Sequence, residues 1–529
     1  MTLLLTTPEQ HSFEDPTLEL DEKRLNKWLA SLPVLNAGDS LRQVLAALEP
    51  LNEQRLDVDK RLRLMGLYQA TVKRLYDSSE PLRLRQQPLS RQQRQATVDN
   101  VERLCLATAN GFKIAIKEIH AAGIQPQDSA RFAQLLRRAV QQLAAALLHS
   151  YRFYRPEPPF VFLELNQLYR LARHHGVHEV KGDAEGNSTA NSLADIYQAI
   201  CLLSLTDPFS AEEGQVDWYF RSLLQFVPGT RIIPGNSWQG TPEGLFYIDL
   251  QSDSRPRHCV FLQSPVAGDE PHILDARTPL QRMHKTLVAL PADRRSKRIE
   301  TNLLKALLPE VTPRDRRRSE RRSAGRWIEV VTGLQAVCDY LNQHVGAGLP
   351  ANKPGHGNIT IRGQARSYGK TPRRGEQVEA TRWRIQDASD KGYRLAWGES
   401  AASLLQVGDL VCVVADSKEE KRSFQLLVVR WVCDERDKGT ELGVEKLAGM
   451  PNPVRVEVPG EDDVDACQAL FLSSTGARDS VARLLAPPEV YCENRSLLLY
   501  VGDREVPVRC TMRVEQAPEF DCFEFTSAR

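Results

Sequence analysis

The sequence predicts an α+β multidomain protein whose N-terminal region is largely α-helical and whose C-terminal region is built from β-strands. Its 529 residues are too many for one hydrophobic core, which favours several domains. Apolar residues recur at helical spacing as far as about residue 225. From residue 327 onward, short apolar segments alternate with turn residues, a pattern typical of small β-barrels and sandwiches.

Composition and charge indicate a soluble globular chain. Hydrophobic residues make up 41% and charged residues 26% of the sequence, so global disorder is not expected. The formal net charge is +1, which means that any attraction for anions must come from a local cluster. The ten cysteines form no CxxC pair, as is usual in a reducing compartment. Because the sequence shows neither a signal peptide nor an apolar segment of membrane length, we expect a cytoplasmic protein.

The first half of the chain divides by its patterns. Residues 1–20 are polar and are expected to form a flexible N-terminus, and residues 21–225 an α-helical domain. In the segment RFAQLLRRAVQQLAAALLHS, the apolar residues fall on one helical face. Residues 226–300 mix β-like segments with a helical pattern and predict a small mixed α/β unit. A basic linker or arginine arm is expected at 301–326.

The second half carries two series of strand patterns. The first spans residues 327–450 and includes RWIEVV, TRWRIQDAS and SFQLLVVRWV. An insertion at about 335–380 begins with a helical pattern and then becomes rich in glycine, proline and basic residues. Residues 451–529 predict a second small β-domain at the C-terminus, in which Gly502-Asp503 forms a hairpin turn.

Two motifs lie near the two ends of the insertion. Arg322 and Arg326 form an RxxxR motif, and Asp387, Ser389 and Gly392 form DxSxxG before a strand pattern. Each motif alone is weak, but the combination resembles the PilZ domain, the bacterial receptor module for cyclic di-GMP. The resemblance covers about residues 314–450 and implies a PilZ-like six-stranded antiparallel β-barrel. The interval between the motifs is longer than is usual in that family.

The residue types in the two motifs suit a cyclic dinucleotide. Guanidinium groups form paired hydrogen bonds with phosphate oxygens and with guanine O6 and N7, and they stack on base faces. A carboxylate accepts hydrogen bonds from guanine N1–H and from the exocyclic amine. The resemblance implies a binding set for cyclic di-GMP that comprises Arg321, Arg322, Arg326, Asp387, Ser389 and Gly392, with Arg318 and Trp431 as further candidates.

The resemblance implies a non-enzymatic cyclic di-GMP receptor with no cofactor and no metal. Family habit implies a protein partner in pilus, motility, secretion or polysaccharide machinery, and a role in surface attachment, biofilm, motility or type IV pilus function. Recruitment to a membrane-associated or polar complex would come through that partner. Two alternatives stay open: a protein-interaction scaffold whose barrel has lost its ligand, and a nucleic-acid-binding protein that uses the basic arm and insertion.

Other clusters favour structural roles. His174, His175 and His178 lie near the end of a helical pattern, and they lack the spacing of a metal motif such as HExxH. Aspartates of the mixed unit, among them Asp253 and Asp275, are expected to shape loops rather than to catalyse. The sequence contains no phosphate-binding glycine loop and no nucleophile motif, so we do not expect an enzyme.

Overall fold

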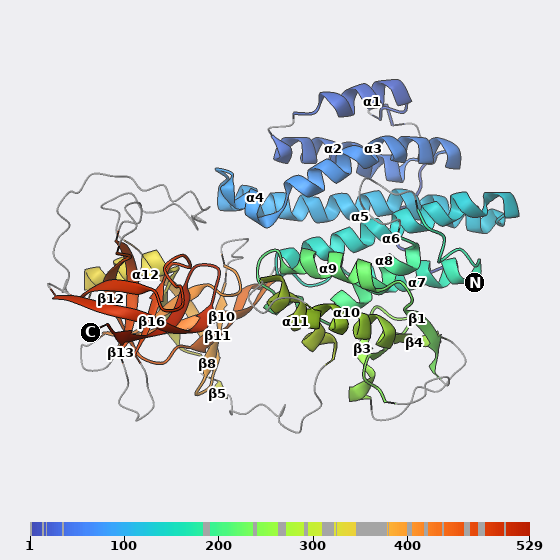
Figure 1. The fold of residues 1–529 in the computed structure, drawn as a ribbon. Helices are drawn as coiled ribbons and strands as arrows, with labels where there is room; N and C mark the ends of the chain where they lie inside the picture. The colour runs from blue at the N-terminus through green and yellow to red at the C-terminus, as the bar shows by residue number, and fades with distance from the viewer. Residues whose placement is uncertain are drawn as a thin grey trace. The chain divides into compact units, whose positions relative to one another are not determined.

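The chain folds into two compact units, Met1–Asp315 and Arg316–Arg529 (Figure 1). The finer domain boundaries expected from the sequence stay predictions. The computed structural model describes residues 3–12, 15–16, 18–33, 36–182, 191–235, 241–262, 271–289, 295–308, 322–323, 325–344, 378, 380–398, 405–416, 422–435, 438–459, 466–473, 482–501 and 504–528.

The first unit is built mainly from stacked helices. In Figure 1, α2 and α3 pack on α5, α5 packs on α6, and α6 packs on α7 and α8. None of the described helices combines the length and apolarity that a membrane span requires. The helices are α1 Glu22–Ser31, α2 Ala37–Glu53, α3 Val58–Ser78, α4 Pro81–Gln86, α5 Arg91–Ala122, α6 Ser129–Arg152, α7 Val161–His174, α8 Leu193–Leu203, α9 Gln215–Phe226, α10 Arg277–Ala289 and α11 Arg295–Leu307.

Local sequence signals define several helix ends. The Asp57 side chain accepts hydrogen bonds from the first backbone N–H groups of α3. Ser90 and Gln93 form a capping box at the start of α5. Gly123 ends the same helix with a positive φ of 85°, a conformation that costs glycine little. The helical character predicted for the N-terminal region is confirmed.

A small antiparallel sheet follows the helices and shares their core. Its strand order is β1-β4-β2-β3. Phe246 on β2 and Leu274 on β4 belong to one buried apolar cluster that extends from Leu5 to Leu307. The mixed unit therefore buries its apolar face against the helices. The strands are β1 Arg231–Pro234, β2 Leu245–Tyr247, β3 Arg257–His258 and β4 Pro271–Asp275.

Part of the N-terminal segment is held against the helices. Leu5 is buried, and the backbone N–H of Thr6 donates to Glu164 Oε1 at 2.8 Å. Glu164 in turn forms a buried ion pair with Lys113, with Nζ 2.7 Å from the carboxylate. His11 forms an isolated parallel bridge with Gln54. Whether this segment is flexible, as its polar composition predicts, stays a prediction.

The second unit begins with a closed, six-stranded antiparallel barrel, which confirms the predicted fold. The strands form the ring β6-β9-β10-β11-β8-β7, closed by the β7–β8 pairing. Trp383, Ile385 and Leu395 are buried on the inner face of β7 and β8. The strands are β6 Trp327–Thr332, β7 Thr381–Ala388, β8 Gly392–Trp397, β9 Leu410–Asp416, β10 Arg422–Glu435 and β11 Gly439–Lys446.

A second closed barrel follows the first, with strand order β12-β13-β14-β17-β16-β15. Helix α12, Leu334–His344, is the first part of the insertion and packs in one apolar cluster with strands of both barrels. Val337 on α12, Val428 on β10 and Leu470 on β13 are members of that cluster. The strands are β12 Met450–Glu457, β13 Cys467–Ser473, β14 Arg483–Ala486, β15 Ser496–Val501, β16 Arg504–Gln516 and β17 Asp521–Ser527.

Candidate functional site

The structure brings the two sequence motifs onto adjacent strands. The short strand β5, Arg322–Ser323, pairs antiparallel with β7, so that Ser323 lies opposite Asp387 and Arg322 lies opposite Ala388. The backbone N–H of Ile385 donates to the Arg326 carbonyl at 2.8 Å. The RxxxR arm therefore runs along the edge of the strand that carries the first residue of DxSxxG. Arg318 and Arg321 lie outside the described residues, and for Arg322 only the backbone is described.

A bulge separates β5 from β6 within the arm. Three residues of the arm stand between Ser323 and Trp327, whereas only two residues of β7 separate their partners Asp387 and Arg384. Gly325 lies in this stretch with a φ of +56°. A β-bulge bends a strand and redirects its side chains. The Arg326 side chain follows directly and is exposed.

The DxSxxG segment forms the turn between β7 and β8. The backbone N–H of Ser389 donates to the Gly392 carbonyl at 2.9 Å, and its hydroxyl donates to the same oxygen at 3.3 Å. Lys446 on β11 contacts this turn: its Nζ donates to the Ser389 carbonyl at 3.3 Å and lies 4.6 Å from the centroid of the Tyr393 ring. Lys446 is not part of the motif, and it places a positive charge beside Ser389.

Gly392 is required by close packing of β8 on β11. A Cβ atom at this position would lie 2.0 Å from the carbonyl oxygen of Val444. Only a residue without a side chain allows the two strands to pair at this distance. Its direct contact with a ligand stays a prediction.

A second bulge places Asp387 on the outer face of the barrel. Ile385 pairs with the buried Leu395, but the register shifts by one residue before Asp387, which pairs with Arg394. Residues directly opposite each other in an antiparallel pair share a face. Because Leu395 points inward, its neighbour Arg394 points outward, and Asp387 points outward beside it.

Charges alternate across this outer face. Arg394 Nη2 donates to Glu441 Oε2 on β11 at 2.6 Å. That hydrogen bond, together with the negative charges of Glu441 and Asp387, raises the pKa of Arg394. The guanidinium therefore lies between two carboxylates and is fixed by one of them. The sequence analysis missed Arg394 and Glu441. Strand alternation could have indicated Arg394, because residues two apart on a strand share a face and Arg394 is two residues after Gly392.

Trp431, the aromatic candidate from the sequence, packs on a neighbouring strand. A Cβ atom on Gly443 would lie 1.8 Å from Trp431 Nε1, so the indole ring lies directly against that glycine. Gly443 pairs with Arg394, which puts the ring near the charged outer face. Contact between Trp431 and a ligand stays a prediction.

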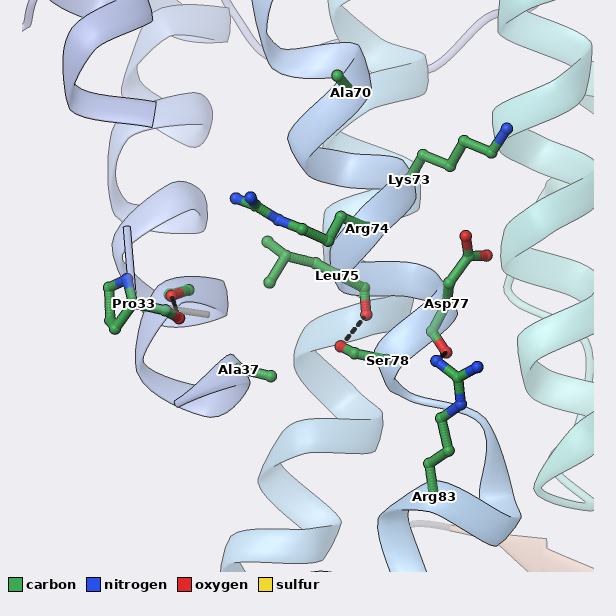
Figure 2. A pocket seen from close by; sticks show the side chains of 10 residues that line it. Pro33, Ala37, Ala70, Lys73, Arg74, Leu75, Asp77, Ser78 and Arg83 are labelled. Carbon is green, nitrogen blue, oxygen red and sulfur yellow. Dashed lines mark hydrogen bonds between the residues drawn. The ribbon is translucent and has the colours of Figure 1, made fainter. Parts of the chain in front are cut away.

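A cavity of about 420 Å³ lies in the helical unit, among α2, α3 and α4 (Figure 2). Its charged lining residues Lys73, Arg74, Asp77 and Arg83 are exposed, and Arg83 also pairs with Glu80 at 3.3 Å. Solvated charges of both signs give this cavity little selectivity for a particular ligand. It contains none of the residues that the sequence motifs identify.

The histidines and aspartates singled out in the sequence make contacts that serve the fold. Burial lowers the pKa of His175 and of His178, which favours their neutral forms. Asp253 caps α7 by accepting from the N–H groups of Phe160 and Leu163 at 2.8 and 3.1 Å. Asp275 forms an ion pair with Arg277. Within the described ranges, no three His, Cys, Asp or Glu side chains are arranged to hold a metal ion.

Comparison with known proteins indicates the family of the chain. A family model described as the N-terminal domain of the cyclic-di-GMP receptor FimW matches residues 23–235, and one described as its middle PilZ domain matches residues 350–453. The cyclic-di-GMP receptor FimW of Pseudomonas aeruginosa (strain PAO1) is 24% identical over an alignment of 586 positions, which covers 100% of this chain and 94% of that relative. The PilZ match includes Asp387, Ser389 and Gly392 and begins after the arginine arm.

Proposed function

The chain belongs to the PilZ-domain cyclic-di-GMP receptor family, and from this premise we propose that it binds cyclic di-GMP and acts as a non-enzymatic receptor. The observation that carries the proposal is the pairing of β5 with β7, which sets Ser323 of the RxxxR arm opposite Asp387 of DxSxxG. This pairing supports the assignment of two motifs separated by the insertion to one site.

The charges of the site suit the ligand. Arg322 and Arg326, assisted by Arg321, are the groups we assign to the phosphates and to the O6 and N7 edges of guanine. Asp387 is assigned to guanine N1–H and the exocyclic amine, because an ionised carboxylate only accepts hydrogen bonds. Ser389, beside the ammonium group of Lys446, completes the hairpin side of the site.

Signal transmission would pass from the hairpin to the second barrel. Glu445 pairs with Gly392 across β8 and β11, and it accepts a hydrogen bond from Arg430 at 2.8 Å. Arg430 also forms an ion pair with Glu515 on β16 of the second barrel. This chain of contacts is a route by which ordering of the arm could alter a surface that a protein partner recognises. The proposed partner belongs to pilus, motility, secretion or polysaccharide machinery, and it would recruit a cytoplasmic receptor to its complex.

Calorimetric titration of cyclic di-GMP into the full-length chain tests the proposal. We expect saturable binding at one or two ligands per chain, lost in Arg322→Ala and in Arg326→Ala. Arg509→Ala is the matched control, because it removes an exposed barrel arginine on β16 outside both motifs. Absence of binding by the intact protein would refute the receptor function and leave a scaffold.

Salt dependence separates the receptor from a nucleic-acid-binding protein. A protein that contacts six to ten DNA phosphates loses about 10³- to 10⁵-fold in affinity between 50 and 200 mM salt. A ligand with only two phosphates must give a much shallower slope. A steep slope with single-stranded or duplex oligonucleotides, and no cyclic di-GMP binding, would instead favour the nucleic-acid alternative.

A further inference from the structure

Trp327 is a large aromatic residue that the barrel leaves in solvent. It is the first residue of β6, immediately after the arginine arm, and its side chain is 56% exposed. Ile328 and Val330, at the second and fourth positions of the same strand, are buried. Alternation along the strand therefore directs Trp327 to the outer face. An exposed tryptophan on a regular strand gains nothing from the core and is typical of a contact surface.

Two arginines on the adjacent strand flank this ring. Trp327 lies directly opposite Arg384 on β7, and the Arg382 guanidinium is 5.9 Å from the indole centroid. Trp383, between the two arginines, is buried in the barrel, so Arg382 and Arg384 share the outer face with Trp327. Glu329 lies opposite Arg382 in the strand register and adds one carboxylate to this face. The surface is thus aromatic and, with the adjacent Arg326, predominantly cationic.

This surface continues the proposed nucleotide site. Arg384 Nη2 lies 3.9 Å from where a Cβ atom on Gly325 would be, which places its guanidinium beside the bulge of the arm. Arg384 and Asp387 are three residues apart on β7 and both point outward. At about 3.3 Å per residue, they are separated by about 10 Å along the strand. One dinucleotide with two bases can span such a separation.

We propose that Trp327, flanked by Arg382 and Arg384, is a base-stacking subsite for the guanine of cyclic di-GMP that Asp387 does not bind. The assignment rests on the proposed receptor function. Indole and guanidinium faces both stack on nucleobases, and the surplus of positive charge suits the two ligand phosphates. Stacking of one base on one aromatic residue corresponds to about a 5- to 150-fold gain in affinity.

The test compares ligand affinity among variants at an exposed position, where the fold is not at stake. Trp327→Ala is expected to weaken cyclic di-GMP binding about 5- to 150-fold, whereas Trp327→Phe, which keeps a stacking ring, stays within about threefold of the parent. Met512→Ala is the control, since it truncates a similarly exposed side chain on the second barrel. Arg382→Gln is expected to weaken binding as well, by loss of one face of the subsite.

A spectroscopic readout separates stacking from an indirect effect. A cyclic dinucleotide with 2-aminopurine in place of one guanine should lose fluorescence on binding to the parent protein and lose less in Trp327→Ala. If Trp327→Ala binds cyclic di-GMP as tightly as the parent while Arg326→Ala does not bind, the subsite is refuted and the receptor function stands. If the parent itself does not bind, the receptor function fails and the subsite fails with it.

Discussion

Gly392→Ala tests the packing that holds the DxSxxG hairpin against the barrel. The added Cβ would lie 2.0 Å from the Val444 carbonyl oxygen and 3.0 Å from the Val444 carbonyl carbon. A carbon–oxygen contact normally needs about 3.3 Å, so β8 and β11 must separate by about 1 Å. The two Val444 atoms that the Cβ would meet belong to the backbone, so no side chain can rotate away to relieve the contact.

The loss of unfolding free energy follows from the hydrogen bonds that such a separation would stretch. The Lys446 N–H donates to the Lys391 carbonyl at 2.8 Å, and Lys446 Nζ donates to the Ser389 carbonyl at 3.3 Å. Each bond contributes about 0.5–1.5 kcal/mol, and overpacking typically costs about 1–3 kcal/mol. We therefore expect the barrel to lose about 1–3 kcal/mol of unfolding free energy and the ligand affinity to fall by about tenfold or more.

Urea unfolding followed by tryptophan fluorescence measures the first effect, because Trp327, Trp383, Trp397 and Trp431 all lie in this barrel. The matched control is Gly398→Ala, just beyond the same strand, where an added Cβ would meet nothing within 4 Å. The control should unfold at the parent midpoint. If Gly392→Ala unfolds within about 0.5 kcal/mol of the parent and binds ligand normally, the packing argument is wrong.

Three further predictions address other parts of the chain. Lys113→Met should destabilise the helical unit by about 3–5 kcal/mol, because it leaves Glu164 buried without its cation; Lys113→Met combined with Glu164→Leu should recover part of that loss in thermal unfolding. Glu441→Gln should weaken cyclic di-GMP binding by about tenfold, because it removes the charged acceptor that holds the Arg394 side chain in place. An unchanged dissociation constant in calorimetry would contradict this role of Glu441. Burial raises the pKa of Cys105 and of Cys201 to about 12, so both thiols stay protonated at pH 8 and should resist iodoacetamide until the helical unit unfolds. The exposed Cys492 should react first, and peptide mass mapping can show the order of modification.

Local patterns predicted the elements of the fold well. Apolar spacing predicted the helices of the first unit, and the alternating segment RWIEVV became β6. The turn residues Gly502-Asp503 indicated a hairpin, and β15 and β16 indeed pair with Val501 opposite Arg504. Such signals are readable because they depend on neighbours within a few residues along the chain.

Packing between distant segments was not readable in the same way. The helical start of the insertion, α12, contributes Val337 and Leu341 to the core between the two barrels. The polar N-terminal segment lodges Thr6 against Glu164, which lies 158 residues away. In both cases the residues in contact are too far apart in the sequence for a local pattern to predict the contact.

By itself the sequence indicated the candidate binding residues, through the resemblance of the arginine arm and the DxSxxG motif to the PilZ domain. Only the tertiary structure decided how they meet. The pairing of Ser323 with Asp387 depends on strand register across the insertion, and the bulge before Asp387 turns that carboxylate to the outer face. Register likewise places Arg394 and Trp327 on the outer face beside the proposed site, because a one-residue change of register moves a side chain to the opposite face of a sheet.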